Sequence, residues 1–253
     1  MTTLGSLAVE INAELGARQD VLTYTTYPTV ANMQDTDRLA IWLKESYTEI
    51  CLGYRFEELC QEFDDVMVPN QDVYQLPPQC RFLRAITLLF PSIGGNAPRP
   101  IRRRHIRNVR RYQAGQNGPP RIYAPFNPGG QPSIIVRPKP DQGYSFIWDI
   151  QVKPTFASTP GGQTNYVSLT NIQLPDDWIG VLKSFTKLKG HVGLIEPDKA
   201  QAEQTYLFGG YDPNLGRKVP GFIKQLTAPR DQLDIEDVEF GLQPMIRRYT
   251  NSV

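Results

Sequence analysis

The spacing of apolar residues changes twice along this chain, from a helical period to alternation and back to a helical period. Between Thr36 and Phe63, apolar residues recur every three to four positions, as on the faces of an α-helix. One stripe is formed by Leu39, Leu43, Tyr47, Ile50 and Tyr54, and a second by Leu52, Phe56, Leu59 and Phe63. We therefore predict one long helix that is covered from more than one side, either by other helices of the chain or by a neighbouring subunit.

Alternating apolar and polar residues characterise the stretch from Asp72 to Leu174, where Pro and Gly separate short runs. The clearest run is Tyr144 to Val152, whose aromatic and branched residues fall on one face, with Ile147 as the exception. Further candidate strands are Phe82 to Phe90, Arg121 to Phe126, Ser133 to Arg137 and Tyr166 to Gln173. This spacing predicts a small antiparallel β-sandwich or barrel.

A helical period returns at Pro175, where Pro followed by Asp is typical of a helix start. Pro197 begins a further short helix that ends near Gly209 and Gly210. Past Tyr211, prolines interrupt the chain often enough to predict an extended arm over residues 211–253. The arm contains more apolar residues than a disordered tail usually does, and this favours binding to a partner.

Together these patterns predict an α+β fold. A helical bundle is built on the long helix and on helices near the C-terminal third, and a small antiparallel β-sandwich or barrel is inserted into it. The expected divisions are an N-terminal helical part over residues 1–70, a β-rich domain over 71–174, a second helical part over 175–210 that packs with the first, and the arm over 211–253.

Composition and charge exclude several functional classes. The chain has 27 Lys and Arg against 26 Asp and Glu, so its formal net charge of +1 gives no overall attraction to nucleic acid or to an anionic membrane. The three cysteines, Cys51, Cys60 and Cys80, follow neither a disulfide framework nor a zinc-site spacing. We expect a reduced, cytosolic site of folding, without a signal peptide or a membrane span.

The sequence contains no recognisable catalytic motif. His105 lies inside an arginine run and His191 at the end of an apolar helix, and neither has the pattern of a catalytic base or a metal ligand. The Gly pairs lack the context of a nucleotide site, and the acidic residues between 57 and 65 are typical of a solvated helix end rather than of a glycosidase pair. We therefore expect no catalytic residue, no cofactor and no metal site.

The densest charged feature is an arginine run formed by Arg99, Arg102, Arg103, Arg104, Arg107, Arg110 and Arg111. On a helix these side chains would spread around much of the circumference and could contact DNA phosphates. The alternative is a surface that pairs with carboxylates of a neighbouring subunit, and the net charge near zero favours this interpretation. A channel that carries double-stranded DNA would need only weak contacts, so both interpretations stay open.

A second charged feature lies near the C-terminus, where arginines follow apolar residues. The candidate partner-binding residues are Leu242, Met245, Ile246, Arg247, Arg248 and Tyr249. The apolar side chains would anchor such a segment on a partner, and the arginines would contact the rim of the interface. The alternative is a tail that folds back on its own domain.

A succession of short motifs carries a family resemblance. The long helix with Phe56-Glu-Glu-Leu is followed by Tyr74-Gln-Leu-Pro, then Gly118-Pro-Pro-Arg-Ile-Tyr, then Ile134-Ile-Val-Arg-Pro-Lys-Pro-Asp, and finally Ile172-Gln-Leu-Pro-Asp-Asp-Trp before a helix pair. In this order, from Thr36 to Tyr206, the chain resembles tailed-bacteriophage head-to-tail connector proteins of the portal-adaptor, or tail-tubular gatekeeper, type.

The resemblance implies a non-enzymatic structural protein of the virion neck that is made in the host cytoplasm. It implies a homo-oligomeric ring, usually dodecameric, which lies beneath the portal protein and joins it to the tail. Double-stranded DNA would pass through the channel of this ring without tight binding, and downstream tail or neck proteins would bind the ring. The resemblance also implies that the C-terminal residues 227–253 dock on the portal.

Three alternatives stay open. The first is another ring of the neck or tail, such as a stopper or a tail-tube component, which the bound partner would distinguish. The second is a nucleic-acid-binding module centred on residues 102–111, whose affinity for duplex DNA would fall steeply with salt. The third is a carbohydrate-acting tail enzyme or binding domain, which would bind or turn over a saccharide.

Overall fold

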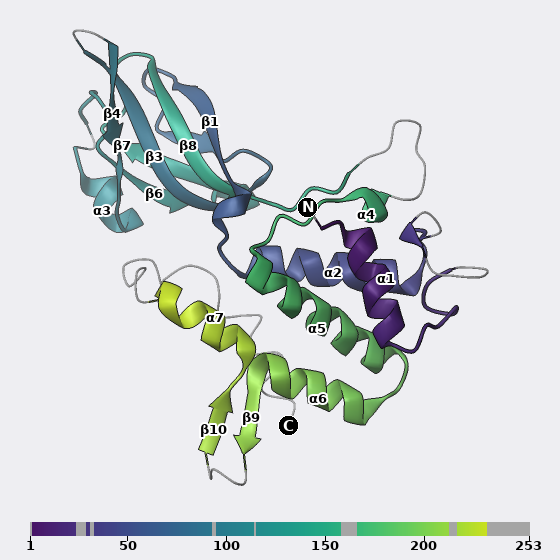
Figure 1. Cartoon of the computed structure of the whole chain (residues 1–253). Helices are drawn as coiled ribbons and strands as arrows, with labels where there is room; N and C mark the ends of the chain where they lie inside the picture. Colours follow the sequence, from purple (N-terminus) through teal and green to yellow (C-terminus); the bar gives the residue numbers. More distant parts are fainter. Residues whose placement is uncertain are drawn as a thin grey trace. The chain divides into compact units, whose positions relative to one another are not determined.

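The structure of the protein is a computed structural model, which describes residues 2–23, 29–30, 33–92, 95–113, 115–157, 166–212 and 217–231. The chain divides into two compact units, one rich in helices and one rich in strands (Figure 1). We name the unit formed by Met1–Glu58 and Pro154–Val253 the helical unit, and Leu59–Lys153 the β unit. The β unit is thus inserted into the helical unit, and its bounds lie N-terminal to the expected 71–174.

The helical unit is organised around α5 (Asp176–Gly193), which packs against α2 (Arg38–Gly53) and α6 (Pro197–Phe208). Its other helices are α1 (Leu4–Glu14), α4 (Tyr166–Leu169) and α7 (Phe222–Asp231). A short antiparallel hairpin, β9 (Gly209–Asp212) and β10 (Arg217–Pro220), connects α6 to α7. The helices expected after Pro175 and Pro197 are confirmed.

The first apolar stripe of α2 forms the centre of the core of the helical unit. Leu39, Leu43, Tyr47 and Ile50 are all buried, as the helical spacing predicts. Helix α5 contributes Trp178, Val181 and Leu182 to the core of this unit. The Tyr47 hydroxyl accepts a hydrogen bond at 3.1 Å from the backbone N–H of Gln173, so this buried polar group is satisfied.

Helix α2 ends at Gly53, so the prediction of one helix as far as Phe63 is wrong. The backbone of Tyr54 is extended (φ −126°, ψ 161°), a single 3₁₀ turn, η2 (Glu57–Leu59), follows, and β1 begins at Cys60. The rings of Tyr54 and Phe56 pack on Trp178, at centroid distances of 4.7 and 4.9 Å. The second stripe is therefore not one face of α2, because Leu52 lies in α2, Phe56 in the irregular segment, Leu59 in η2 and Phe63 in β1.

Two further sequence-based expectations are corrected. The segment 166–173 forms the short helix α4 and an irregular stretch instead of a strand. Residues 211–212 and 217–231 are not an extended arm, because they belong to β9, β10 and α7. Gly209 and Gly221 make this hairpin possible, since a Cβ on Gly221 would lie 2.3 Å from the Gly209 nitrogen. Residues 232–253 lie outside the described residues.

The β unit contains two four-stranded sheets. The first has the order β1 (Cys60–Met67), β8 (Tyr144–Val152), β3 (Cys80–Ser92), β4 (Gly95–Pro100), with antiparallel neighbours throughout. The second has the order β2 (Val73–Gln75), β7 (Ser133–Arg137), β6 (Ile122–Phe126), β5 (Arg102–Arg103), and β5 pairs with β6 in parallel. The strands predicted over 82–90, 121–126, 133–137 and 144–152 are confirmed.

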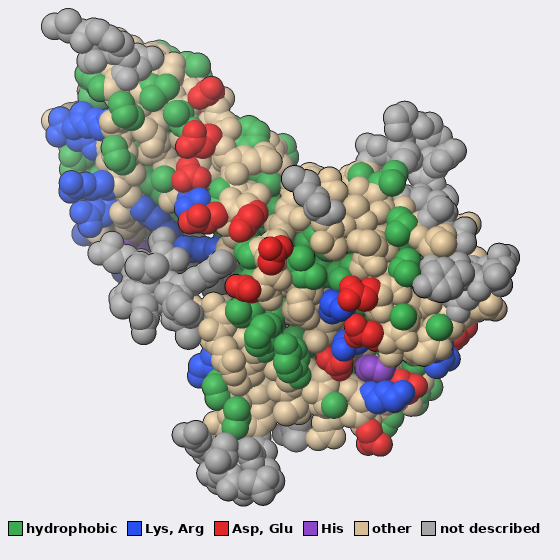
Figure 2. Space-filling model, viewed as in Figure 1, with side chains coloured by type: hydrophobic (Ala, Val, Ile, Leu, Met, Phe, Trp, Pro, Cys, Tyr) green, Lys and Arg blue, Asp and Glu red, His purple; other side chains and the backbone are tan. Residues whose placement is uncertain are grey.

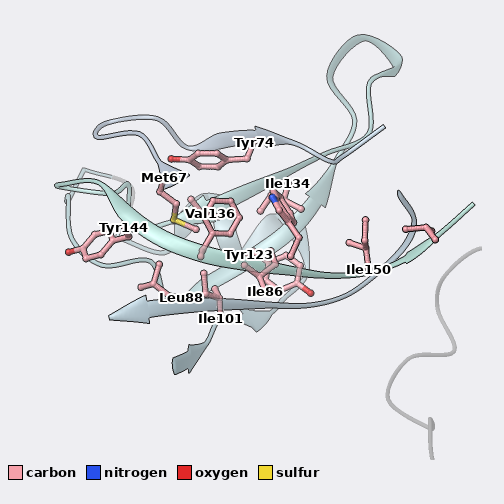
Figure 3. Close-up of a cluster of buried hydrophobic side chains, with 13 residues drawn as sticks. Met67, Tyr74, Ile86, Leu88, Ile101, Tyr123, Ile134, Val136, Tyr144 and Ile150 are labelled. Carbon is pink, nitrogen blue, oxygen red and sulfur yellow. The ribbon is translucent and has the colours of Figure 1, made fainter. Parts of the chain in front are cut away.

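One buried core joins the two sheets. It includes Phe146, Trp148 and Ile150 from β8, Ile86 and Leu88 from β3, and Tyr123, Ile134 and Val136 from the second sheet. Figure 3 shows labelled members from both sheets, among them Ile86, Leu88, Tyr123, Ile134 and Val136, meeting in one cluster. Neither sheet closes into a barrel within the part of the chain that the structure describes, because β1 and β4 are edge strands of one sheet and β2 and β5 of the other. The fold class is therefore α+β, as predicted.

Candidate protein-interaction surfaces

The arginine run is distributed over three elements, so the single arginine-bearing helix considered from sequence is not formed. Arg99 lies in β4, Arg102 and Arg103 form β5, and the remaining members lie on or next to α3 (Ile106–Arg111). The run is held against β6, because the backbone N–H of Arg102 donates to the Arg121 carbonyl at 3.0 Å. The result is a basic surface on the edge of the second sheet.

Helix α3 has an apolar side and a basic side. Ile106 and Val109 pack with Ala124 and Ile135 on the outer side of the second sheet, where they form a small separate core. Helical spacing then places Arg107, Arg110 and Arg111 together on the opposite side. The Arg110 guanidinium lies 5.4 Å from the centroid of the Phe126 ring, so part of its side chain covers an apolar group.

Arg99 and five arginines on or next to β5 and α3 are exposed and have no carboxylate partner among the residues that the structure describes; the five are Arg102, Arg104, Arg107, Arg110 and Arg111. Two acidic residues of the β unit are engaged elsewhere, Asp72 with Arg137 and Asp149 with Arg84. Figure 2 shows Lys and Arg side chains gathered on the part of the β unit that carries α3. We name these five side chains the arginine face.

The helical unit uses its cations differently. Three lysines of α5 form ion pairs with glutamates of the neighbouring helices: Lys183 with Glu10 and Glu14, Lys187 with Glu14 and Glu203, and Lys189 with Glu45 and Glu49, at N–O distances of 2.7 to 3.1 Å. Burial would raise the pKa of Glu14, but its hydrogen bonds with two lysines hold the pKa below its usual value. These lysines therefore join α1, α2 and α6 to α5, a role that the sequence did not reveal.

The turn between α5 and α6 exposes a strained apolar residue. Ile195 has φ of +59° and is 88% exposed, in the left-handed position after a helix end where Gly is usual. Val192, three residues earlier, is 64% exposed. Next to this turn, His191 Nδ1 lies 2.7 Å from Glu196 Oε2, and this hydrogen bond lowers the pKa of Glu196. The turn is thus a candidate contact surface that sequence reasoning missed.

A surface hollow of about 470 Å³ lies in the β unit beside the edge strands β1 and β2. Its lining is Asp65, Val66, Val68, Gln71, Val73, Tyr74, Gln75, Pro128, Gln131 and Ser133. The Tyr74 hydroxyl is already hydrogen-bonded to Val68 and Gln71 at 3.1 Å, and Asp65 accepts from the Trp148 indole at 3.1 Å. The polar groups of the hollow thus serve the fold, and they do not form a nucleophile–base pair.

The remaining sequence-based candidates give no enzyme-like site. Burial raises the pKa of the Cys51 thiol to about 12, so this cysteine is not a ready nucleophile. His105 accepts a hydrogen bond from the Arg107 backbone N–H at 3.3 Å and thereby caps α3. Among the described residues, no group of three or more His, Cys, Asp or Glu side chains is placed to hold a metal ion, and no helix has the length and apolarity to cross a membrane.

The C-terminal candidates are not tested by the structure. Leu242, Met245, Ile246, Arg247, Arg248 and Tyr249 all lie outside the described residues.

The described residues thus present an exposed arginine face and an exposed apolar turn. A comparison with protein families identifies the class: the family model described as SU10 adaptor protein matches residues 2–207. The chain belongs to this family, and the recognition of a phage head-to-tail adaptor from the sequence motifs is confirmed. No curated protein matches the chain at a significant level.

Membership of an adaptor family has consequences for the earlier expectations. It makes the chain a structural component of a bacteriophage virion that interacts with other head or tail proteins. The match ends at Leu207, so the β9–β10 hairpin, α7 and the C-terminal residues follow the matched region. These parts are therefore the natural place to look for contacts peculiar to this chain.

Proposed function

We propose that this protein forms the adaptor ring that joins the portal protein to the tail and surrounds the DNA path at the neck. The family match over residues 2–207 carries the proposal, because an adaptor must bind components on both of its sides. Unpaired charges on the β unit and exposed apolar residues on the helical unit supply surfaces that neighbours could cover. A structural protein of this kind needs no catalytic site, cofactor or metal.

The C-terminal residues are proposed as the portal contact. Residues 232–253 follow α7 and contain the candidate anchors Leu242, Met245, Ile246 and Tyr249 with Arg247 and Arg248 beside them. A segment of this kind binds by burying its apolar side chains on the partner, while the arginines contact the rim. Docking of the segment would link the helical unit to the portal through α7, which packs against α6.

Deletion of the C-terminal residues tests this contact. A cut at residue 227 would remove the last turn of α7, so a deletion of 232–253 is the cleaner variant. We expect the shortened chain to keep the helical circular dichroism of the full chain and to lose co-purification with the portal protein. The matched control replaces only Arg247 and Arg248 with Ala, and should weaken portal binding by about tenfold without abolishing it. Undiminished portal binding by the 232–253 deletion would refute the contact.

A second candidate function, binding of duplex DNA through the arginine face, is favoured by one observation. Its five arginines have no carboxylate partner in the described part of the chain, as expected for a surface that meets phosphates. Duplex binding that falls steeply with salt and is lost on replacing Arg107, Arg110 and Arg111 would support a DNA-binding module. The neighbours of the protein in the particle distinguish the adaptor from a stopper or a tail-tube ring.

A further inference from the structure

The two units of the chain carry opposite net charge. Residues 59–153, the β unit, contain 13 Lys and Arg against 6 Asp and Glu, whereas the rest of the chain contains 14 against 20. The net charge of +1 therefore hides a basic unit and an acidic unit within one chain. Such a division favours contacts between unlike units of neighbouring molecules, because opposite surface potentials attract and like potentials repel.

The basic side of this division is the arginine face. Arg107, Arg110 and Arg111 share the solvent side of α3, and Arg102 and Arg104 are exposed on and after β5. The elements beneath are held by backbone hydrogen bonds, for example from the Arg104 N–H to the Tyr123 carbonyl at 2.8 Å. The arginines are therefore presented on a fixed scaffold, which reduces the entropy lost when they bind a partner.

The acidic side is found where α2 ends and α5 begins. Glu57 and Glu58 lie in η2, and Asp176 and Asp177 form the first turn of α5. The two pairs flank one ring contact, because Phe56, next to Glu57, packs edge-on against Trp178, next to Asp177, at 4.9 Å. We name these four side chains the carboxylate end.

The carboxylate end differs from the five glutamates that pair with α5. All four side chains are exposed, and none forms an ion pair with a cation that the structure describes. In contrast, Glu10, Glu14, Glu45, Glu49 and Glu203 are paired with lysines of α5. These four exposed carboxylates are thus opposite in sign to the five exposed arginines of the arginine face.

We propose that the arginine face of one copy of this chain binds the carboxylate end of the next copy. Guanidinium groups pair with carboxylates through two parallel hydrogen bonds, and such charge-assisted pairs set the orientation of an interface. The two surfaces lie on different units of the same chain, so the contact is heterologous, and repetition around an axis closes a ring. The proposal rests on the proposed adaptor function and assigns surfaces to its contact between copies.

A second copy accounts for the arginine face better than DNA does. The same sequence supplies an acidic unit of opposite charge for this face, whereas the whole chain has a formal net charge of only +1, which gives no overall attraction to DNA. DNA binding is therefore an alternative outcome of the experiment below.

Charge reversal of the full-length chain tests the contact. The basic variant carries Arg107→Glu, Arg110→Glu and Arg111→Glu, and the acidic variant carries Glu57→Lys, Glu58→Lys and Asp177→Lys. A control with Lys199→Glu, Lys218→Glu and Lys224→Glu changes the net charge as much as the basic variant does, at exposed positions on α6, β10 and α7, which carry neither surface. Self-association is measured by sedimentation velocity at about 50 mM and about 500 mM salt, where screening differs strongly.

The expected results form a fixed pattern. The natural chain associates with increasing concentration, and high salt weakens the association by about tenfold or more. Each reversal variant alone associates at least about tenfold more weakly than the natural chain, and the lysine control does not. An equimolar mixture of the two variants regains association, because natural and reversed pairs then alternate around the ring.

Several results would overturn the proposal. If the natural chain stays monomeric at every concentration and salt, the proposal is refuted before any variant is measured. Variants whose mixture stays dissociated would show that the two surfaces do not meet between copies. Loss of duplex binding by the basic variant, with unchanged self-association, would assign the arginine face to DNA. Co-purification of the natural chain with the portal protein is measured in parallel. If only the contact between copies is wrong, the natural chain will still co-purify with the portal protein.

Discussion

Replacement of Gly5 by Ala should destabilise the protein, although Gly→Ala in a helix normally stabilises it. Gly5 lies in the first turn of α1, and a Cβ at this position would lie 2.6 Å from the Ser168 carbonyl oxygen and 2.7 Å from Val30 Cγ1. The start of α1 cannot easily move away, because the Leu4 N–H donates to the Thr170 carbonyl at 2.9 Å. The new methyl group must therefore displace backbone.

The magnitude follows from two opposing effects. The intrinsic gain in helix propensity is at most about 1 kcal/mol, whereas forced backbone and side-chain shifts in a packed region cost about 1–3 kcal/mol. We expect a net loss of about 1–2 kcal/mol for Gly5→Ala. For a chain of this size, each kcal/mol shifts Tm by about 2–4 °C.

Gly180→Ala is the matched control. Gly180 lies within α5, and a Cβ there would meet nothing within 4 Å, so the same substitution should stabilise by up to about 1 kcal/mol. Urea unfolding followed by helical circular dichroism measures both variants. A Gly5→Ala chain as stable as the Gly180→Ala chain would show that α1 does not approach residue 168 as closely as described.

Two other substitution and labelling experiments test single features of the helical unit. Ile195→Gly should stabilise the chain by about 1 kcal/mol, since Gly adopts the left-handed backbone without the steric cost that a branched residue has there. The control Ile195→Ala keeps that cost and should not stabilise the chain. Equal urea unfolding midpoints for the two variants would contradict backbone strain at residue 195. The Cys51 thiol should react with a thiol reagent at pH 8 about 100-fold or more slowly in the folded chain than in denaturant, because burial raises its pKa to about 12. Rapid labelling of Cys51 in the folded chain would show that α2 is not covered at this position.

Segments in which apolar residues recur with a clear period can be assigned to a helix or a strand from the sequence. Tyr144 to Val152 alternates cleanly because β8 lies in the interior of its sheet, with its inward side chains in the shared core. The β1 strand was missed because it is an edge strand, and its sequence Cys60-Gln-Glu-Phe-Asp-Asp-Val-Met is mostly exposed and polar. An exposed edge imposes no alternation, so the spacing of Phe56, Leu59 and Phe63 fits a helix face although α2 ends at Gly53.

The interaction surfaces show a similar division. The arginine run is visible as composition, but its distribution over β4, β5 and α3 depends on pairing between Arg102 and Ile122, which are distant in sequence. The carboxylate end depends on the packing of Phe56 against Trp178, and the lysine pairs of α5 on contacts with three other helices. Long-range contacts of this kind leave no local signal. The strained turn at Ile195 also gives no sequence signal, since a left-handed residue after a helix is usually Gly and this position is Ile.

A reconstruction of the neck of the native particle by electron cryomicroscopy tests the account most directly. We expect copies of this chain in one closed ring between portal and tail, with the β unit of each copy against the end of α2 and the start of α5 of the next. A particle in which the chain is absent from the portal–tail junction, or present there as isolated copies that do not touch, would contradict the account.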